Sequence, residues 1–124
     1  MRSILLVDDS PDTVAMYAVG LSHAGYRPLT ASDARSALDQ LKQEHPDAVV
    51  TDLQLVGGRS GWELIEEIKK DASTCRIPVI VLTGREDPSI ALTAHRIGCA
   101  AVLTKPCLPD ELALVLHRVL VPAA

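Results

Sequence analysis

The stretch ILLVDDSPD, residues 4–12, places four apolar residues directly before two adjacent aspartates, Asp8 and Asp9. A continuous apolar run of this length is typical of a strand that is covered on both faces, as the strands of parallel sheets are. The two acids then mark the end of that strand, where the chain turns. The stretch therefore predicts a parallel sheet whose first strand ends in carboxylates.

Further apolar segments of strand length recur along the chain, and helical patterns separate them. The expected strands are 4–7, 27–30, 48–50, 79–82 and 101–103, of which 27–30 is the least apolar. Apolar residues with helical spacing are Ala34, Leu38 and Leu41, then Gly61, Leu64, Ile65 and Ile68, and finally Leu112, Val115, Leu116 and Val119.

Signals for helix boundaries agree with this division of the chain. Ser60 and Glu63 match a capping box, in which each side chain satisfies a backbone N–H of the other. The remaining signals are prolines suited to a first helical turn, Pro88 and Pro109, and glycines suited to helix ends, Gly25 and Gly98.

Length and composition indicate one globular domain, residues 1–124. The chain is 48% hydrophobic and 23% charged, and it contains no apolar run near the roughly 20 residues that span a bilayer. Its net charge of −4, without a basic cluster, argues against direct contact with nucleic acid. Three widely spaced cysteines, Cys75, Cys99 and Cys107, give neither a disulfide framework nor a metal-ligand spacing. We expect a cytoplasmic protein that contacts neither membrane nor nucleic acid.

A strand followed by a helix, five times over, predicts a doubly wound α/β fold with helices on both faces of a parallel sheet. Ligands of such sheets bind at the carboxyl ends of the strands. The residues that end the first, third, fourth and fifth strands are therefore the candidates for chemistry. They are Asp8 and Asp9, Asp52, Thr83 and, slightly beyond the last strand, Lys105.

This set of side chains suits one kind of chemistry. Carboxylates about 5 Å apart repel each other by about 3 kcal/mol at an effective dielectric constant near 20, so a cluster of three favours a divalent cation. Oxygen ligands favour Mg²⁺, or Mn²⁺, over zinc. A lysine and a hydroxyl beside a metal-bound carboxylate suit phosphoryl transfer, and the carboxylate can itself accept the phosphoryl group.

The order DD, D, T and K-P at matching strand ends, spread over nearly the whole chain, resembles the receiver domain of bacterial two-component response regulators. The resemblance implies a flavodoxin-like, three-layer (βα)5 sandwich with a parallel five-stranded sheet in the order 2-1-3-4-5. The spacing of the motifs alone does not fix that order.

The resemblance also implies a metal site. Asp52 matches the phosphoacceptor, which is also a metal ligand. Asp9 matches a direct Mg²⁺ ligand, and Asp8 matches the acid that acts through a water molecule. Gln54 stands at the position whose backbone carbonyl completes the site.

Three further positions match residues that act on the phosphoryl group. Lys105 matches the lysine that pairs with it, and Thr83 matches the hydroxyl that moves onto one of its oxygens after transfer. Pro106 matches a proline whose preceding peptide bond is typically cis.

The chain departs from the family pattern in three places. Val102 stands where the family often has an aromatic that rotates inward when the threonine moves, so we expect this coupling to be weakened or routed through residues 84–88. Val56 replaces a usual proline in a loop one residue longer than the short form, which glycines 57, 58 and 61 leave adaptable. Cys107 replaces a common phenylalanine, which predicts altered packing under the fifth helix.

The resemblance implies a signalling phosphoacceptor with slow self-catalysed phosphorylation and dephosphorylation, not an enzyme acting on a metabolite. Its phosphodonor would be a sensor histidine kinase or a histidine phosphotransfer protein. Output would pass to a downstream protein or a fused output domain, or through a homodimer formed by the fourth helix, fifth strand and fifth helix, roughly residues 88–120. We expect no effector domain within 1–124, which fits a stand-alone regulator and a receiver of a longer protein equally well.

Three alternatives from other classes stay open. A phosphorylation-independent pseudo-receiver would be a pure interaction module, although the acid, threonine and lysine set is intact. A small Mg²⁺-dependent phosphatase would need a second carboxylate two residues after its nucleophile, where this chain has Gln54. A flavin carrier would suffer from the carboxylates at its phosphate site and from having only Tyr17, Tyr26 and Trp62 as aromatics.

Overall fold

A computed structural model describes residues 1–121 of the chain as five strands alternating with five helices. Every strand expected from the sequence forms, and each is one residue longer than the expected range. The elements are β1 (Ser3–Val7), α1 (Pro11–His23), β2 (Arg27–Ala31), α2 (Ala34–Glu44), β3 (Ala48–Thr51), α3 (Gly61–Lys70), β4 (Val79–Thr83), α4 (Pro88–Ile97), β5 (Ala101–Thr104) and α5 (Pro109–Leu120).

The five strands form one parallel sheet in the order β2-β1-β3-β4-β5, which confirms the predicted fold. Val7 at the end of β1 pairs with Ala31 of β2 and with Thr51 of β3. At the other side of the sheet, Thr83 of β4 pairs with Thr104 of β5. The carboxyl ends of the strands are therefore in register, and the residues that follow them meet along one edge.

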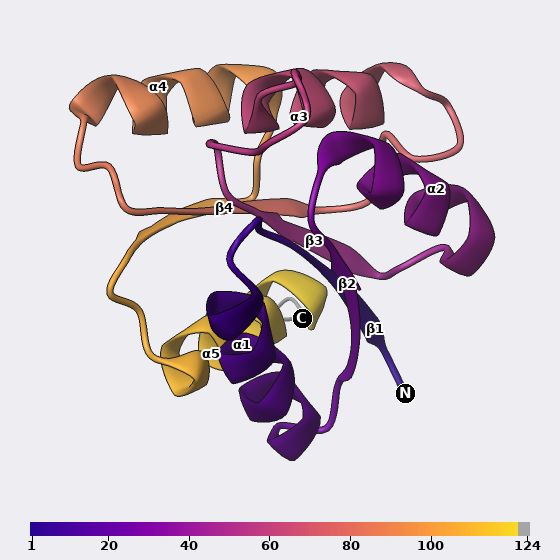
Figure 1. Cartoon of the computed structure of the whole chain (residues 1–124), viewed down its shortest axis with the longest axis vertical. Helices are drawn as coiled ribbons and strands as arrows, with labels where there is room; N and C mark the ends of the chain where they lie inside the picture. The colour runs from indigo at the N-terminus through magenta and orange to yellow at the C-terminus, as the bar shows by residue number, and fades with distance from the viewer. Residues whose placement is uncertain (122–124) are drawn as a thin grey trace.

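Helices cover both faces of the sheet. Helices α2, α3 and α4 lie on one side, and α1 and α5 lie on the other (Figure 1). Two buried clusters fill the space between the layers, and successive residues of β1 alternate between them: Leu5 and Val7 face one, Ile4 and Leu6 the other. This alternation explains why the opening stretch is apolar at every position, as parallel strands covered on both faces require.

The predicted boundary signals form as expected. The Ser60 hydroxyl accepts the Glu63 N–H at 3.2 Å, and the Glu63 carboxylate accepts the Ser60 N–H at 3.4 Å, which completes the capping box. Helices α4 and α5 each begin with the expected proline. Gly98 ends α4 in the left-handed conformation with φ of 98°, and Gly25 follows α1 with φ of 94°.

The connection from β3 into α3 contains three glycines, and two different structural features require them. Gly57 and Gly58 adopt φ of 89° and 87°, a conformation that other residues rarely take. Gly61 is buried, and a Cβ atom there would lie 2.2 Å from the carbonyl oxygen of Asp52. We expected Gly61 to make the loop adaptable, but its role is instead a close approach: it lets α3 begin directly against the residue that follows β3.

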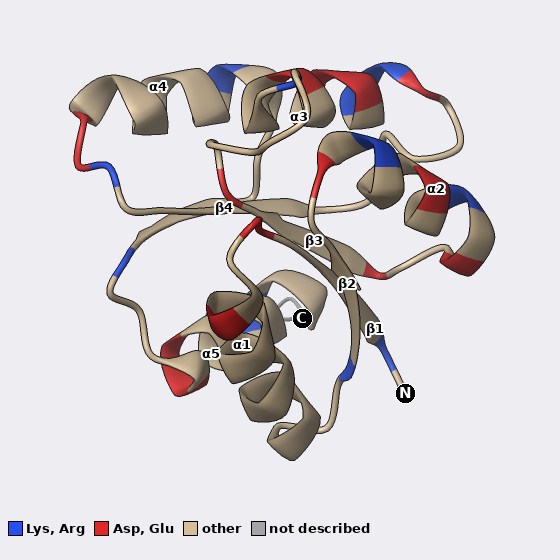
Figure 2. Cartoon of the chain, viewed as in Figure 1, with Lys and Arg blue, Asp and Glu red and all other residues tan. Residues whose placement is uncertain are grey.

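Charged residues are distributed unevenly between the sheet and the helices. Positively and negatively charged positions are both scattered over the helices and loops, and some acidic residues follow the ends of central strands (Figure 2). Within residues 1–121, no helix has the length and apolar character needed to cross a membrane.

Candidate functional site

Two aspartates lie side by side at the carboxyl edge of the sheet. Asp8 follows β1 and Asp52 follows β3, the neighbouring strand, so the topology brings together residues that are far apart in sequence. The Oδ1 atom of Asp8 accepts the Ser10 N–H at 2.9 Å. The Oδ1 atom of Asp52 accepts the N–H groups of Leu53 at 2.6 Å and Gln54 at 3.2 Å. Backbone amides thus orient both carboxylates.

Lys105 joins the two carboxylates. Its Nζ atom lies 2.7 Å from Oδ2 of Asp8 and 2.9 Å from Oδ2 of Asp52. Burial on its own lowers the pKa of Lys105, but the hydrogen bonds and negative charges of the two aspartates outweigh burial, and the net effect raises its pKa. The side chain is therefore a fixed positive charge at neutral pH, with one hydrogen bond to each acid.

The backbone of Lys105 is tied to the neighbouring strand. Its N–H donates to the carbonyl oxygen of Thr83 at 2.8 Å, and its peptide bond to Pro106 is cis. Thr83 ends β4 and is buried, and its hydroxyl accepts the Arg85 N–H at 3.3 Å. The structure thus places Asp8, Asp52, Thr83 and Lys105 at the ends of four strands, where the sequence predicted them.

The expected metal ligands are not all gathered. Asp9 and Gln54 are exposed, and within residues 1–121 no three His, Cys, Asp or Glu side chains are arranged to hold a metal ion. The sequence predicted three clustered carboxylates, whereas the structure pairs Asp8 and Asp52 through Lys105, because the ammonium group supplies their counter-charge. The donor chemistry, three carboxylates and a carbonyl, fits a hard cation such as Mg²⁺.

Val102 lines a hollow at the surface of the molecule. It lies in β5, pairs with Val81 and is only partly buried. A cleft of about 380 Å³ opens next to it, with Ile90 and Thr104 among the lining residues. Val102 thus lies at a hollow between β5 and the start of α4.

Trp62 stands in the first turn of α3, as expected, and is partly buried. It lines a second cleft, of about 480 Å³, together with Gln54 and Arg85. Since Gln54 is one of the expected metal-site positions, the indole ring lies where it can report changes at the site.

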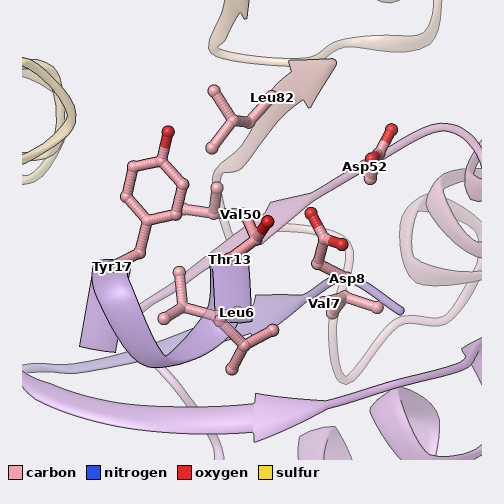
Figure 3. A pocket seen from close by; sticks show the side chains of 9 residues that line it. Leu6, Val7, Asp8, Thr13, Tyr17, Val50, Asp52 and Leu82 are labelled. Carbon is pink, nitrogen blue, oxygen red and sulfur yellow. The ribbon is translucent and has the colours of Figure 1, made fainter. Parts of the chain in front are cut away.

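Sequence patterns did not predict that Tyr17 contributes to this region of the protein. They suggested Tyr17 only as one of the aromatics that could stack on a flavin. Its ring lines a cavity of about 10 Å³ together with both carboxylates, while its hydroxyl points away from Asp8 and Asp52 (Figure 3). That hydroxyl donates to the backbone carbonyl of Cys107 at 2.5 Å. Burial is the main cause that raises the pKa of Tyr17. Its helical spacing to Leu21 marks an inward face, but no sequence signal pairs it with Cys107.

Comparisons with known proteins agree with this geometry. Residues 4–117 match the response regulator receiver domain family. The phosphate regulon transcriptional regulatory protein PhoB of Escherichia coli is 35% identical over 111 residues, which cover 90% of this chain and 48% of PhoB. Protein PilH of Pseudomonas aeruginosa is 32% identical over 120 residues, covering 97% of this chain and 98% of PilH. The chain thus spans about half the length of PhoB and nearly all of PilH.

Solved structures show the same fold. Chemotaxis response regulator CheY4 of Vibrio cholerae superposes with a TM-score of 0.89 at 29% identity, covering 97% of this chain and 99% of CheY4. Receiver domains are signalling phosphoacceptors, phosphorylated on an aspartate, that bind Mg²⁺ and work with histidine kinases and output domains. Because these matches cover most of the chain and the strand order agrees with them, the chain belongs to the response regulator receiver domain family.

Proposed function

We propose that this chain is a phosphorylation-dependent switch in which Asp52 accepts a phosphoryl group from a phosphohistidine of a histidine kinase or a phosphotransfer protein. One observation carries the proposal: Lys105 binds Asp8 and Asp52 at once, at 2.7 Å and 2.9 Å. An acceptor carboxylate, a second acid and a fixed positive charge therefore share one edge of the sheet. The roles of individual residues are those that the family resemblance implies, and this arrangement supports them.

Transfer requires a carboxylate oxygen of Asp52 to attack the phosphorus in line with the donor nitrogen. A P–O bond forms while the P–N bond breaks, and the imidazole leaves with the electron pair and takes up a proton. Asp52 is suited to this role because the N–H groups of Leu53 and Gln54 hold its Oδ1 atom, which fixes the plane of the carboxylate. The Oδ2 atom faces Lys105.

Lys105 and Thr83 then act on the transferred group. Lys105 exchanges its contact with Asp52 for a contact with a phosphoryl oxygen, where its charge offsets the added negative charge. The hydroxyl of Thr83 is buried and accepts the Arg85 N–H, so it has to turn to donate to the phosphoryl group.

A divalent cation completes the proposed site. Asp9, Asp52 and the backbone carbonyl of Gln54, with Asp8 acting through water, would hold Mg²⁺ or Mn²⁺, which supplies positive charge beside the acceptor when bound. The side chain of Asp8 is already oriented by the Ser10 N–H. Asp9 is exposed and so is free to turn toward the edge of the sheet.

Output follows a route that does not depend on an aromatic ring at the fifth strand. Val102 is too short to swing between two environments, so the movement of Thr83 passes to residues 84–88, which connect it to α4. The partner surface is the face of α4, β5 and α5, roughly residues 88–120, which binds a downstream protein, a fused output domain or a second copy. We expect a phosphorylation-dependent change in residues 84–88; a large displacement centred on Val102 would contradict this route.

The decisive test is the mass of the intact protein after incubation with Mg²⁺ and acetyl phosphate. We expect one added phosphoryl group on the unaltered chain and on Asp39→Asn, an exposed acid on α2 that serves as the matched control. Asp52→Asn is expected to remain unmodified. Undiminished single phosphorylation of Asp52→Asn would refute the proposed acceptor, and an unmodified wild-type chain would favour a pseudo-receiver.

A further inference from the structure

Helix α1 holds the segment that carries Lys105. The hydroxyl of Tyr17 donates to the carbonyl oxygen of Cys107, two residues after Lys105 and 90 residues away from Tyr17 in sequence. Both residues are buried, Tyr17 with 3% and Cys107 with 6% of its surface exposed. A buried hydrogen bond of this kind fixes the position of a backbone carbonyl, since leaving that carbonyl unpaired is unfavourable.

A second contact between α1 and the same segment is independent of this hydrogen bond. A Cβ atom added at Gly20 would lie 2.2 Å from the Cβ atom of Pro109. Gly20 stands three residues after Tyr17, so both face the same side of the helix. A side chain at position 20 would overlap the ring of Pro109, so the two helices can approach this closely only with glycine there. Helix α1 therefore packs against residues 107–109 at two points one helical turn apart.

The start of α5 lacks the anchor that the other helices have. In each of the first four helices, the side chain of the N-cap residue accepts a hydrogen bond from a backbone N–H of the first turn. Leu108 is the N-cap of α5 and makes no such bond. On the side toward Lys105, the Lys105 N–H binds the Thr83 carbonyl at 2.8 Å. The Tyr17 hydroxyl thus supplies the second fixed point of the segment between β5 and α5.

The Tyr17 hydroxyl does not act on the reacting atoms directly. It points away from Asp8 and Asp52, although the ring lines the same small cavity as these two aspartates (Figure 3). Any influence on phosphoryl transfer has to pass through the backbone from Cys107 to Lys105. The ammonium of Lys105 binds two carboxylates at once, so a small displacement of its backbone weakens both contacts.

We propose that Tyr17 is a positioning residue for phosphoryl transfer: its hydrogen bond to Cys107, supported by the close packing of Gly20 on Pro109, holds Lys105 against Asp8 and Asp52. This inference rests on the proposed function of the site. If the inference holds, α1 and residues 105–109 move together. A partner that moves α1 then also changes the placement of Lys105.

Tyr17→Phe tests the inference because it keeps the ring and removes the hydroxyl. We expect the rate of phosphorylation by acetyl phosphate to fall at least about tenfold, since a misplacement of about 1 Å at a reacting site costs up to about a hundredfold. Tyr26→Phe, the same change at the other tyrosine, is the control and is expected to keep the full rate.

A double variant separates positioning from a general loss of stability. If Tyr17 acts through Lys105, Tyr17→Phe has no further effect on the rate once Lys105→Met is present. If Tyr17→Phe lowers the phosphorylation rate by the same factor in the wild type and in Lys105→Met, its role is merely structural and the inference is overturned.

Amide hydrogen exchange gives a readout that needs no phosphorylation. In Tyr17→Phe we expect the Lys105 N–H to exchange at least about tenfold faster, with a smaller change at the central residues of β1, because the opening is local. An unchanged Lys105 amide would refute the inference even in a chain that acetyl phosphate does not modify. If Asp52→Asn blocks labelling while Tyr17→Phe changes neither rate nor exchange, the proposed function stands and this inference fails.

Discussion

Replacing Lys105 with methionine removes the ammonium between two carboxylates while keeping most of the aliphatic stem. The Oδ2 atoms of Asp8 and Asp52 lie 2.7 Å and 2.9 Å from the same nitrogen, so they are less than about 6 Å apart. Their side chains are only 10% and 13% exposed, which limits screening by solvent. The variant therefore keeps two largely buried negative charges close together without their counter-charge.

The size of the effect follows from this geometry. Two unit charges at this separation repel by about 3 kcal/mol at an effective dielectric constant near 20, and removing one partner of a buried ion pair typically costs about 3–5 kcal/mol. We expect the free energy of unfolding of Lys105→Met to fall by about 3 kcal/mol near neutral pH. Mg²⁺ is expected to stabilise the variant more than the wild type, because no ammonium competes with the cation for the carboxylates.

Urea unfolding followed by circular dichroism measures this loss. With a slope of about 2 kcal/mol per M, the midpoint is expected to fall by about 1.5 M. Lys70→Met removes an exposed lysine at the end of α3 and is expected to leave the midpoint nearly unchanged. Adding Asp52→Asn to Lys105→Met removes the repulsion and is expected to restore most of the lost stability. A single variant as stable as the wild type, or a double variant no more stable than the single one, would refute the reasoning.

Three further predictions concern the same edge of the sheet. Gly61→Ala is expected to lower the free energy of unfolding by about 2 kcal/mol, because its new Cβ atom would lie 2.2 Å from the Asp52 carbonyl oxygen. The control is Gly84→Ala, whose Cβ atom would meet nothing within 4 Å and which is expected to change that free energy by less than about 0.5 kcal/mol. Equal stabilities of the two variants in urea would contradict this prediction. The pKa of Lys105 is raised in the folded state, so its ion pairs stabilise the fold fully below the ordinary value of 10.5 and are lost as the pH rises through the folded value. Thermal unfolding in strongly alkaline buffers is therefore expected to show a loss in the wild type that Lys105→Met lacks. Mg²⁺ is expected to change the fluorescence of Trp62, because Trp62 lines one cleft with Gln54. In Asp52→Asn, the Mg²⁺ concentration that gives half of this change is expected to rise at least about tenfold. Identical titrations of the two proteins would argue against Asp52 as a ligand.

Local patterns in the sequence predicted the central strands most clearly, because a parallel strand covered on both faces needs an unbroken apolar run. The edge strand β2 is partly exposed, and its segment was the least apolar of the five. The run from Ile4 to Val7 is an unbroken one: its residues alternate between two buried clusters, so no position tolerates a polar side chain. The same pattern predicted that Asp8 and Asp52 end strands. Their adjacency came from the family resemblance, since an apolar run does not say which strand lies next to it.

The contacts that tie the site together could not be read from local patterns. Lys105 and Asp8 are 97 residues apart, and Tyr17 and Cys107 are 90 apart, so these pairs exist only after the layers have packed. The sequence suggested a cluster of acids around a cation. It could not show that, in the folded chain, the lysine takes the place beside Asp8 and Asp52 where that cation was expected.

The charges at this edge also bear on how a phosphoryl group could be sensed without an aromatic at Val102. Asp8, Asp9 and Asp52 carry three negative charges against the one ammonium of Lys105, which already binds two of them. A phosphoryl group on Asp52 replaces one negative charge with about two, so Lys105 has to leave a carboxylate to reach it and a divalent cation has to offset the remainder. In the proposed switch, movement of Lys105 would displace the segment that Tyr17 holds, and rotation of the Thr83 hydroxyl would break its bond to the Arg85 N–H. We infer that the backbone segments after β4 and β5 carry the change to the surface, a route that needs no rotating ring.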